Sequence, residues 1–190
     1  MENTLTQIYT NKTTFTVYLL FLVLLTLVLQ QTETRYLITD EVLINQFKDK
    51  FSGERLKKMV QIRQKGGFSE AVFSIIQLFI KVSFISACLL SGTWIAKWKL
   101  RFSQLFKITA LAEIVFIIAK TSKIFWFLVV DKDYTLKEFS DFQPLSLLSL
   151  FDTNILESYL VYPLGVLSVF EVLYWLILAY LIKLFLNKEF

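Results

Sequence analysis

Three ionisable side chains interrupt an apolar stretch that is long enough to cross a membrane. The stretch is Leu105–Val130, and the side chains are Glu113, Lys120 and Lys123. On an α-helix, Glu113 and Lys120 lie about 20° apart around the axis, with Lys123 about 60° further round. A charged side chain at the centre of a bilayer costs about 2.5–3.5 kcal/mol, so this face should contact protein or water instead of lipid. The spacing therefore predicts a charged face inside a membrane.

Two other apolar stretches carry ionisable or amide side chains of the same kind. Gln77 and Lys81 lie in the stretch 71–95, and Glu171 lies in the stretch 164–186. At 1.5 Å per residue, the three lysines and Glu171 lie about 10–15 Å below the outer ends of these stretches. Glu113 lies in the opposite half, about 12 Å from the cytoplasmic side. We expect one intramembrane polar face made of Lys81, Glu113, Lys120, Lys123, Glu171 and Gln77.

This set of charges has two interpretations. In the structural one, Glu171 pairs with Lys81 or Lys120, Lys123 reaches Asp131 or Asp133, and Glu113 bonds Thr109 or Lys107. In the functional one, three lysines face a single carboxylate in the outer half. An anionic lipid head group, an acidic substrate or the carboxylate of a partner helix would neutralise the surplus.

Several kinds of chemistry are excluded by residue type. The chain contains no histidine and a single cysteine, Cys88, so a disulfide within the chain, a Cys/His zinc site and a His-dependent triad are all impossible. The sequences HExxH, GxSxG and GxxxxGK[ST] are absent, and no pair of intramembrane aspartates exists. We therefore expect a non-enzymatic protein with no metal and no other cofactor.

The elements that would position these residues follow from composition. The chain has 190 residues, of which 55% are hydrophobic, with only five glycines and two prolines. This composition predicts an all-α polytopic membrane protein, a bundle of four transmembrane helices in a single domain covering 1–190. We expect the spans at about 14–30, 71–95, 105–130 and 164–186. Residues after the first span lack a small-x-small cleavage pattern, which favours an uncleaved anchor.

The segments between the expected spans are also helical in character. Residues 34–67 predict an exposed helical insert that is capped at Thr39 or Asp40 and broken at Ser52-Gly53. Residues 139–157 contain an apolar run that is too short to cross, which indicates an interfacial or partly re-entrant helix starting near Pro144.

Charge and small residues predict orientation and packing. The loop from Lys97 to Arg101 is basic and carries no acidic residue, so the positive-inside rule places it, and both chain termini, in the cytoplasm. The net charge of +4 is divided between loops beside the membrane, and we expect no nucleic acid as a partner. Ser83, Ala87 and Ser91 form a small-residue stripe that is typical of close helix packing.

Two stretches resemble known families. The segment from Lys97 to Phe127 and the run PLSLLSLF…YLVYPLGVLSVFEVLYWLILAYLIK from Pro144 to Lys183 resemble a group of small inner-membrane proteins of Bacteroidota-type bacteria. Members of that group are sometimes labelled sulfate permeases. The F-E-x-x-Y-W pattern, beginning at Phe170, is similar to the Yip1-like membrane domain. These resemblances imply a multi-pass protein of the cell inner membrane and no defined activity.

The favoured hypothesis is an accessory or partner subunit of a larger membrane complex, because the charge surplus requires something to neutralise it. Its partners would be membrane lipids and other membrane protein subunits. One alternative is a small transporter or lipid-handling protein that uses a Lys/Glu-lined groove. A further alternative is a membrane immunity protein that shields another component from a toxin.

Overall fold

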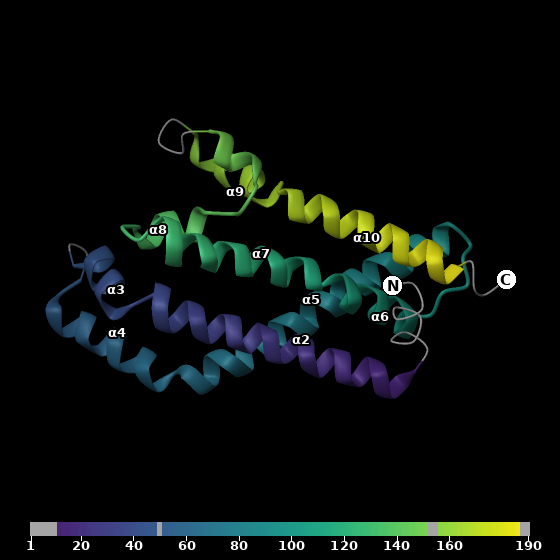
Figure 1. Ribbon diagram of the computed structural model, residues 1–190, viewed down its shortest axis with the longest axis horizontal. Coiled ribbons are helices and arrows are strands. Elements are labelled where there is room, and N and C mark those ends of the chain that lie inside the picture. Colours follow the sequence, from purple (N-terminus) through teal and green to yellow (C-terminus); the bar gives the residue numbers. More distant parts are fainter. Residues whose placement is uncertain (1–10, 49–50, 152–155, 187–190) are drawn as a thin grey trace.

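The computed structural model describes residues 11–48, 51–151 and 156–186, and these are helical apart from short connections (Figure 1). The described residues form no β-strand, and their β-pairing is an isolated bridge between Ser146 and Ser168. Four helical stretches are long and apolar enough to cross a membrane: Lys12–Leu37, Gly67–Ile95, Phe102–Val130 and Val169–Leu186. The all-helical prediction is therefore confirmed, as is the presence of four such stretches.

The first long helix runs further than expected. Helix α2 covers Lys12–Thr32 and continues without a break into a π-helical turn, η1, at Glu33–Leu37. Asn11 caps its start by accepting a hydrogen bond from the backbone N–H of Thr13 at 3.0 Å. The predicted end at 30 is wrong because the polar sequence after it stays helical. As a result, Glu33 lies on the same continuous helix as the apolar residues that precede it.

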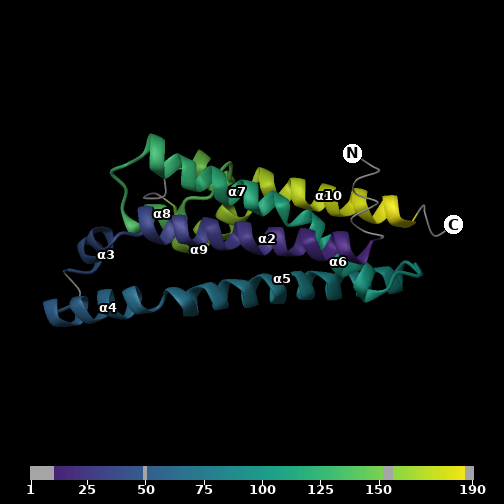
Figure 2. The same cartoon turned by 60° about the horizontal axis from the view of Figure 1, so that its bottom comes forward.

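The second long helix, α5, covers Gly67–Ile95 and also begins before its expected start at 71. Helix α4, Gly53–Lys65, leads into α5 through Gly66. The two helices overlie one line in Figure 2, whereas Figure 1 shows a bend between them. Helix α3, Asp40–Phe47, begins at Thr39, whose hydroxyl accepts from the backbone N–H of Val42 at 3.4 Å.

The third long stretch is interrupted at Glu113. Helix α6 covers Phe102–Ala112, α7 covers Ile114–Phe125, and a π-helical turn, η2, completes it at Trp126–Val130. The backbone N–H of Glu113 is shared between the carbonyls of Thr109 and Ala110, at 3.2 and 3.3 Å.

The interruption is supported from α2. The Tyr18 hydroxyl donates to the carbonyls of Leu111, at 3.1 Å, and Ala110, at 3.3 Å. Irregular backbone inside an apolar bundle is tolerated where a neighbouring helix satisfies it, and Tyr18 does so here.

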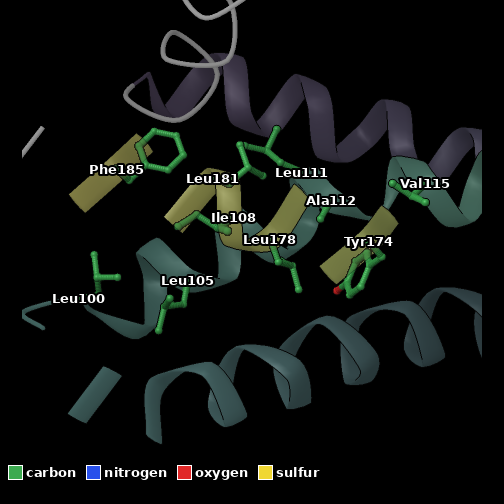
Figure 3. Packing of buried hydrophobic residues seen from close by; sticks show 10 residues of the cluster. All are labelled: Leu100, Leu105, Ile108, Leu111, Ala112, Val115, Tyr174, Leu178, Leu181 and Phe185. Atoms are coloured by element: carbon green, nitrogen blue, oxygen red, sulfur yellow. The ribbon is translucent and has the colours of Figure 1, made fainter. Parts of the chain in front are cut away.

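The core is centred on α6, whose residues contact α7 and α10, Val169–Leu186 (Figure 3). Its ten buried members are Leu100, Leu105, Ile108, Leu111, Ala112, Val115, Tyr174, Leu178, Leu181 and Phe185. A smaller cluster of Leu37, Ile124, Phe127 and Phe139 lies toward the other end, where η1, α7 and η2 meet α8, Leu136–Asp141.

The predicted small-residue stripe is wrong as a packing surface. Ala87 and Ser91 are exposed, and Ser83 is only half-buried. The neighbouring face of α5 packs instead, through the fully buried Ser86, whose hydroxyl lies 3.1 Å from the hydroxyl of Thr109 on α6. Helical periodicity identifies small-residue faces, but it does not say which one meets a neighbour.

The predicted interfacial helix near Pro144 is also wrong. Leu145 has a positive φ of 53°, and the only helical turn nearby is a short 3-10 helix, η3, at Leu147–Leu150. The backbone N–H groups of Leu147 and Val169 bond the carbonyls of Leu167 and Leu145, at 2.9 and 3.0 Å. This crossed pairing uses the donors that a helix would need.

The last span starts later than expected for the same reason. Helix α9 covers Ser158–Val166, and α10 begins only at Val169. Residues 152–155 of the expected interfacial segment lie outside the described residues.

A capping box at the start of α8 gives a testable prediction. Thr135 and Glu138 bond each other's backbone N–H groups, at 2.7 and 3.2 Å, and these bonds hold the pKa of Glu138 below its ordinary value. The resulting stability is present above the ordinary pKa and is lost as pH falls through the lowered one. We expect Thr135→Ala to cost about 1 kcal/mol locally and to raise the pKa of Glu138. NMR titration of the Glu138 carboxyl and amide exchange of α8 measure both effects, with exposed Ser140→Ala as the unaffected control.

Candidate functional site

A cavity of about 200 Å³, lined by both polar and apolar side chains, lies between α2, α5 and α7. We call it the charged groove. Among its lining residues, the polar ones are Thr26, Gln30, Ser74, Gln77, Lys81, Glu113 and Lys120. Four of the six residues predicted for the polar face, namely Gln77, Lys81, Glu113 and Lys120, are therefore brought together in one place.

An ion pair between α5 and the α6–α7 junction forms one end of the charged groove. The Lys81 ammonium lies 2.9 Å from Glu113 Oε2 and 3.4 Å from the centre of the Phe116 ring. Tyr174 of α10 packs against Phe116, with 4.6 Å between ring centroids, and its ring centre lies 5.7 Å from the ammonium. The ammonium is thus held by a carboxylate and an aromatic face together.

The two partners of this pair differ sharply in burial. Glu113 is 3% exposed, whereas the Lys81 side chain is 38% exposed. Glu113 Oε1 and Tyr174 Oη are also buried, and these two side chains interact with each other. The carboxylate therefore depends on Lys81 for its charge-assisted bond.

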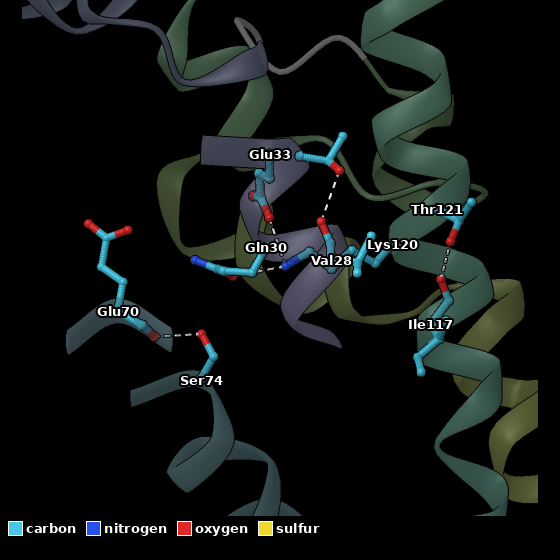
Figure 4. Close-up of polar contacts among 9 residues, drawn as sticks. Val28, Gln30, Glu33, Glu70, Ser74, Ile117, Lys120 and Thr121 are labelled. Carbon is cyan, nitrogen blue, oxygen red and sulfur yellow. Dashed lines mark hydrogen bonds and ion pairs between the residues drawn. The ribbon is translucent and has the colours of Figure 1, made fainter. Parts of the chain in front are cut away.

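A second ion pair lies at the other end of the groove (Figure 4). The Lys120 ammonium lies 2.7 Å from Glu33 Oε2 and donates to Gln30 Oε1 at 3.1 Å. The Lys120 side chain is 32% exposed, and Glu33 is 19% exposed. In both pairs the lysine side chain is the more exposed partner and the carboxylate side chain is the more buried one.

Lys123 and Glu171, the other two predicted site residues, lie elsewhere. The Lys123 ammonium lies 4.5 Å from the centre of the Phe139 ring on α8. Glu171 accepts a hydrogen bond from the indole N–H of Trp175, one turn along α10, at 3.1 Å. Neither lines the charged groove.

The predicted pairings are wrong. Glu171 pairs with neither Lys81 nor Lys120, and the partner of the Glu113 side chain is Lys81 instead of Thr109 or Lys107. Depths counted from apolar runs placed Glu113 and Lys81 at different levels. The true helices start earlier, and both residues lie near the middle of the bundle: Lys81 is about 21 Å from either end of α5, and Glu113 is about 16 Å from the start of α6.

Two important residues, Gln30 and Glu33, were missed because they follow the apolar run of the first span. A signal for them does exist in the sequence. Thr26, Gln30 and Glu33 are spaced by four and three residues, so they share one face of a helix that continues past 30. With Glu33 and Glu113 as partners, the predicted surplus of lysines no longer needs a carboxylate from outside the chain.

The groove opens on one side and is closed below. Gln77 lines it and is exposed on α5, between the exposed apolar side chains Phe73 and Ile80. Below the Lys81–Glu113 pair, α2, α5 and α6 enclose only about 10 Å³ among Leu22, Val82, Ala110 and other apolar residues.

The chemistry available in the groove is ionic binding. Two ammonium groups, each fixed by a carboxylate, present free donor capacity beside the amide of Gln77. The described residues include no group of three or more His, Cys, Asp or Glu side chains that could hold a metal ion. In comparisons with known proteins, no family model, no curated protein and no solved structure matches this chain.

Proposed function

We propose that the chain is a multi-pass protein of the cell inner membrane with its four long helices spanning the bilayer. The start of α2, the α5–α6 connection and the end of α10 lie at one end of the bundle (Figure 1). The described basic residues at that end are Lys12, Lys97, Lys99, Arg101, Lys107 and Lys183. The opposite end carries mixed charges. The positive-inside rule makes the basic end cytoplasmic.

Within that membrane, the charged groove binds the anionic group of a membrane-dissolved amphiphile, and the protein is a lipid-handling protein. The observation that carries this proposal is the asymmetry of the two ion pairs. Lys81 and Lys120 are 38% and 32% exposed, while Glu113 and Glu33 are 3% and 19% exposed. A phosphate or carboxylate entering the groove would meet ammonium groups and not carboxylates.

Depth and access favour an amphiphile over a water-borne anion. The opening beside Gln77 is framed by apolar side chains that face the hydrocarbon, so a ligand would enter laterally from the bilayer. An anionic head group at mid-bilayer is costly without partners. A site that supplies such partners at that depth lowers the barrier to moving a head group across the membrane.

The accessory-subunit hypothesis loses one of the three observations that motivated it. The ion pairs of Lys81 with Glu113 and of Lys120 with Glu33 supply carboxylates from this chain. The small size of the chain and the absence of a catalytic motif still motivate the hypothesis. Association with other membrane subunits, an immunity role and the resemblance to Bacteroidota-type inner-membrane proteins stay predictions.

The test is lipid transfer in proteoliposomes. We expect the purified protein to accelerate transbilayer movement of fluorescent phosphatidylglycerol more than that of fluorescent phosphatidylcholine. Lys120→Met removes one ammonium group from the groove. A charge-assisted contact that contributes about 1.4 kcal/mol corresponds to a factor of about ten in rate, so we expect phosphatidylglycerol movement to slow about tenfold. Lys132→Met, an exposed lysine outside the groove, is the matched control.

Three results would overturn the proposal. They are the absence of acceleration by the wild-type protein, equal acceleration of both lipids, and an unchanged rate in Lys120→Met. A protein that co-purifies with a stoichiometric membrane partner and moves no lipid would instead support the accessory-subunit hypothesis.

A further inference from the structure

Two further cavities lie on another face of α7, away from the charged groove. The larger, about 920 Å³, is bounded by Ile118, Phe125 and Trp126 of α7 and η2 and by Pro144 and Leu145. We call it the tail groove. The smaller, about 440 Å³, is formed by residues of α8 and the segments on either side of it, and we call it the head cavity. The two cavities share Trp126, Phe142 and Ser149, so they adjoin.

The surface of the tail groove is mainly apolar, although two hydroxyl-bearing residues line it. Thr121 and Ser122 line it, but their hydroxyls donate to the carbonyls of Ile117 and Ile118, at 2.8 and 2.9 Å. Such side chains present little free polarity. From Trp126 to Ile118 the groove follows α7 for about 12 Å toward the middle of the bundle. A groove of this depth and character on a membrane helix matches an acyl chain.

The head cavity differs in charge and position. It lies beyond Trp126, where α7 and η2 end at Asp131, a position typical of the membrane–water interface. Its ionisable lining consists of three carboxylates, Asp131, Glu138 and Asp141, against one lysine, Lys137. Glu138 is engaged by Thr135. Asp131 and Asp141, both half-buried, line the cavity, and Asp141 also interacts with Lys123, which does not line it.

Aromatic stacking fixes the boundary between the two cavities. The rings of Trp126 and Phe142 are stacked at 5.8 Å with 16° between their planes, and Phe142 also meets Phe127 edge-on at 5.1 Å. The glycerol region of a lipid would lie against this wall, with its tail on one side and its head group on the other.

From these adjoining cavities we infer a resident-lipid site, in which the tail groove takes an acyl chain and the head cavity takes a protonated amine head group. Phosphatidylethanolamine has this chemistry. Its ammonium would pair with Asp131 and Asp141, and its phosphate would lie within reach of Lys137. Because the site favours a cationic terminus and the charged groove favours an anion, the lipid held here is distinct from the ligand of the groove.

Native mass spectrometry of the full chain in detergent tests the site. After delipidation and addition of equal amounts of dioleoyl phosphatidylethanolamine and dioleoyl phosphatidylglycerol, we expect about tenfold preferential retention of the former. Asp131→Asn combined with Asp141→Asn should abolish the preference, and Asp133→Asn, outside the cavity, should preserve it. Ser122→Trp should reduce retention of both lipids by filling the tail groove, whereas Leu128→Trp should not.

Lys137→Glu gives an independent readout on an exposed position where misfolding is not a concern. It removes the only lysine of the head cavity and should increase the preference. Equal retention of the two lipids by the wild type, a preference that survives the double aspartate variant, or a preference lowered or unchanged by Lys137→Glu would overturn the inference. Lys120→Met should leave this retention unchanged, which separates the two sites.

Discussion

Replacing Lys81 with methionine is expected to lower the free energy of unfolding by about 3–5 kcal/mol, the largest effect of any single substitution in the charged groove. The reason is the burial of its partner. Glu113 is 3% exposed, so the variant leaves a buried carboxylate without its cationic partner. Unfolding in detergent by titration with sodium dodecyl sulfate measures the loss.

The reverse substitution, Glu113→Gln, should cost less. Lys81 is 38% exposed, so its ammonium can turn toward the groove when its partner is neutral. The double variant Lys81→Met with Glu113→Leu should recover most of the loss, because replacing both members of a buried pair by apolar groups is often neutral. If the double variant is as unstable as Lys81→Met alone, the pair is not the cause. Lys132→Met, an exposed lysine, controls for loss of charge.

Enlarging Ala112 to leucine is expected to destabilise the fold by about 1–3 kcal/mol through overpacking. Ala112 is fully buried in the core cluster. It is the last residue of α6, next to Glu113, where the helix is interrupted. The extra methylenes have no free space there, so α6 and α10 must separate. The same unfolding titration checks this result.

Ala87→Leu is the matched control, because Ala87 is an exposed alanine on α5. We expect its effect to stay within about 0.5 kcal/mol, as for surface positions in general. Equal losses in the two variants would mean that the buried face of α5 has been assigned wrongly. The pair of variants therefore decides between Ser86 and the stripe of Ser83, Ala87 and Ser91 as the packing face.

Both effects arise from the same property of an apolar bundle. In the proposed membrane setting, lipid is as apolar as leucine, so burying a leucine between two helices gains little from the hydrophobic effect. Close packing and a few polar contacts between helices carry the stability instead. The Lys81–Glu113 pair, the Ser86–Thr109 bond at 3.1 Å and the Tyr18 bonds to α6 are contacts of that kind.

Composition and hydrophobic runs determined the helical class of this protein and the presence of four long apolar helices. They also placed Gln77 with Lys81 on one face of the second stretch and Glu113 with Lys120 on one face of the third, because helical spacing brings residues of one helix to a common face. The cap at Thr39 was likewise readable, since a hydroxyl before an acidic first turn is a local signal.

Only the tertiary structure decided which charges meet. Spacing within a helix fixes angles around that helix, but the level at which two helices face each other depends on where each one starts. Starts that differ from the apolar runs brought Glu113 opposite Lys81, and a continuation past 30 brought Glu33 to Lys120. Pairing between Leu145–Leu147 and Leu167–Val169 replaced the expected interfacial helix by contacts that no local pattern encodes.

The sequence could not predict which helix faces pack together, for a different reason. In a soluble helix, hydrophobicity separates the buried face from the exposed one, and its period reveals the core. In α2 and α5, exposed residues such as Phe21 and Phe84 are as apolar as the buried Leu22 and Val82. Where both faces are apolar, the hydrophobic pattern carries no information about which one meets protein, and only the fit between the helices decides it.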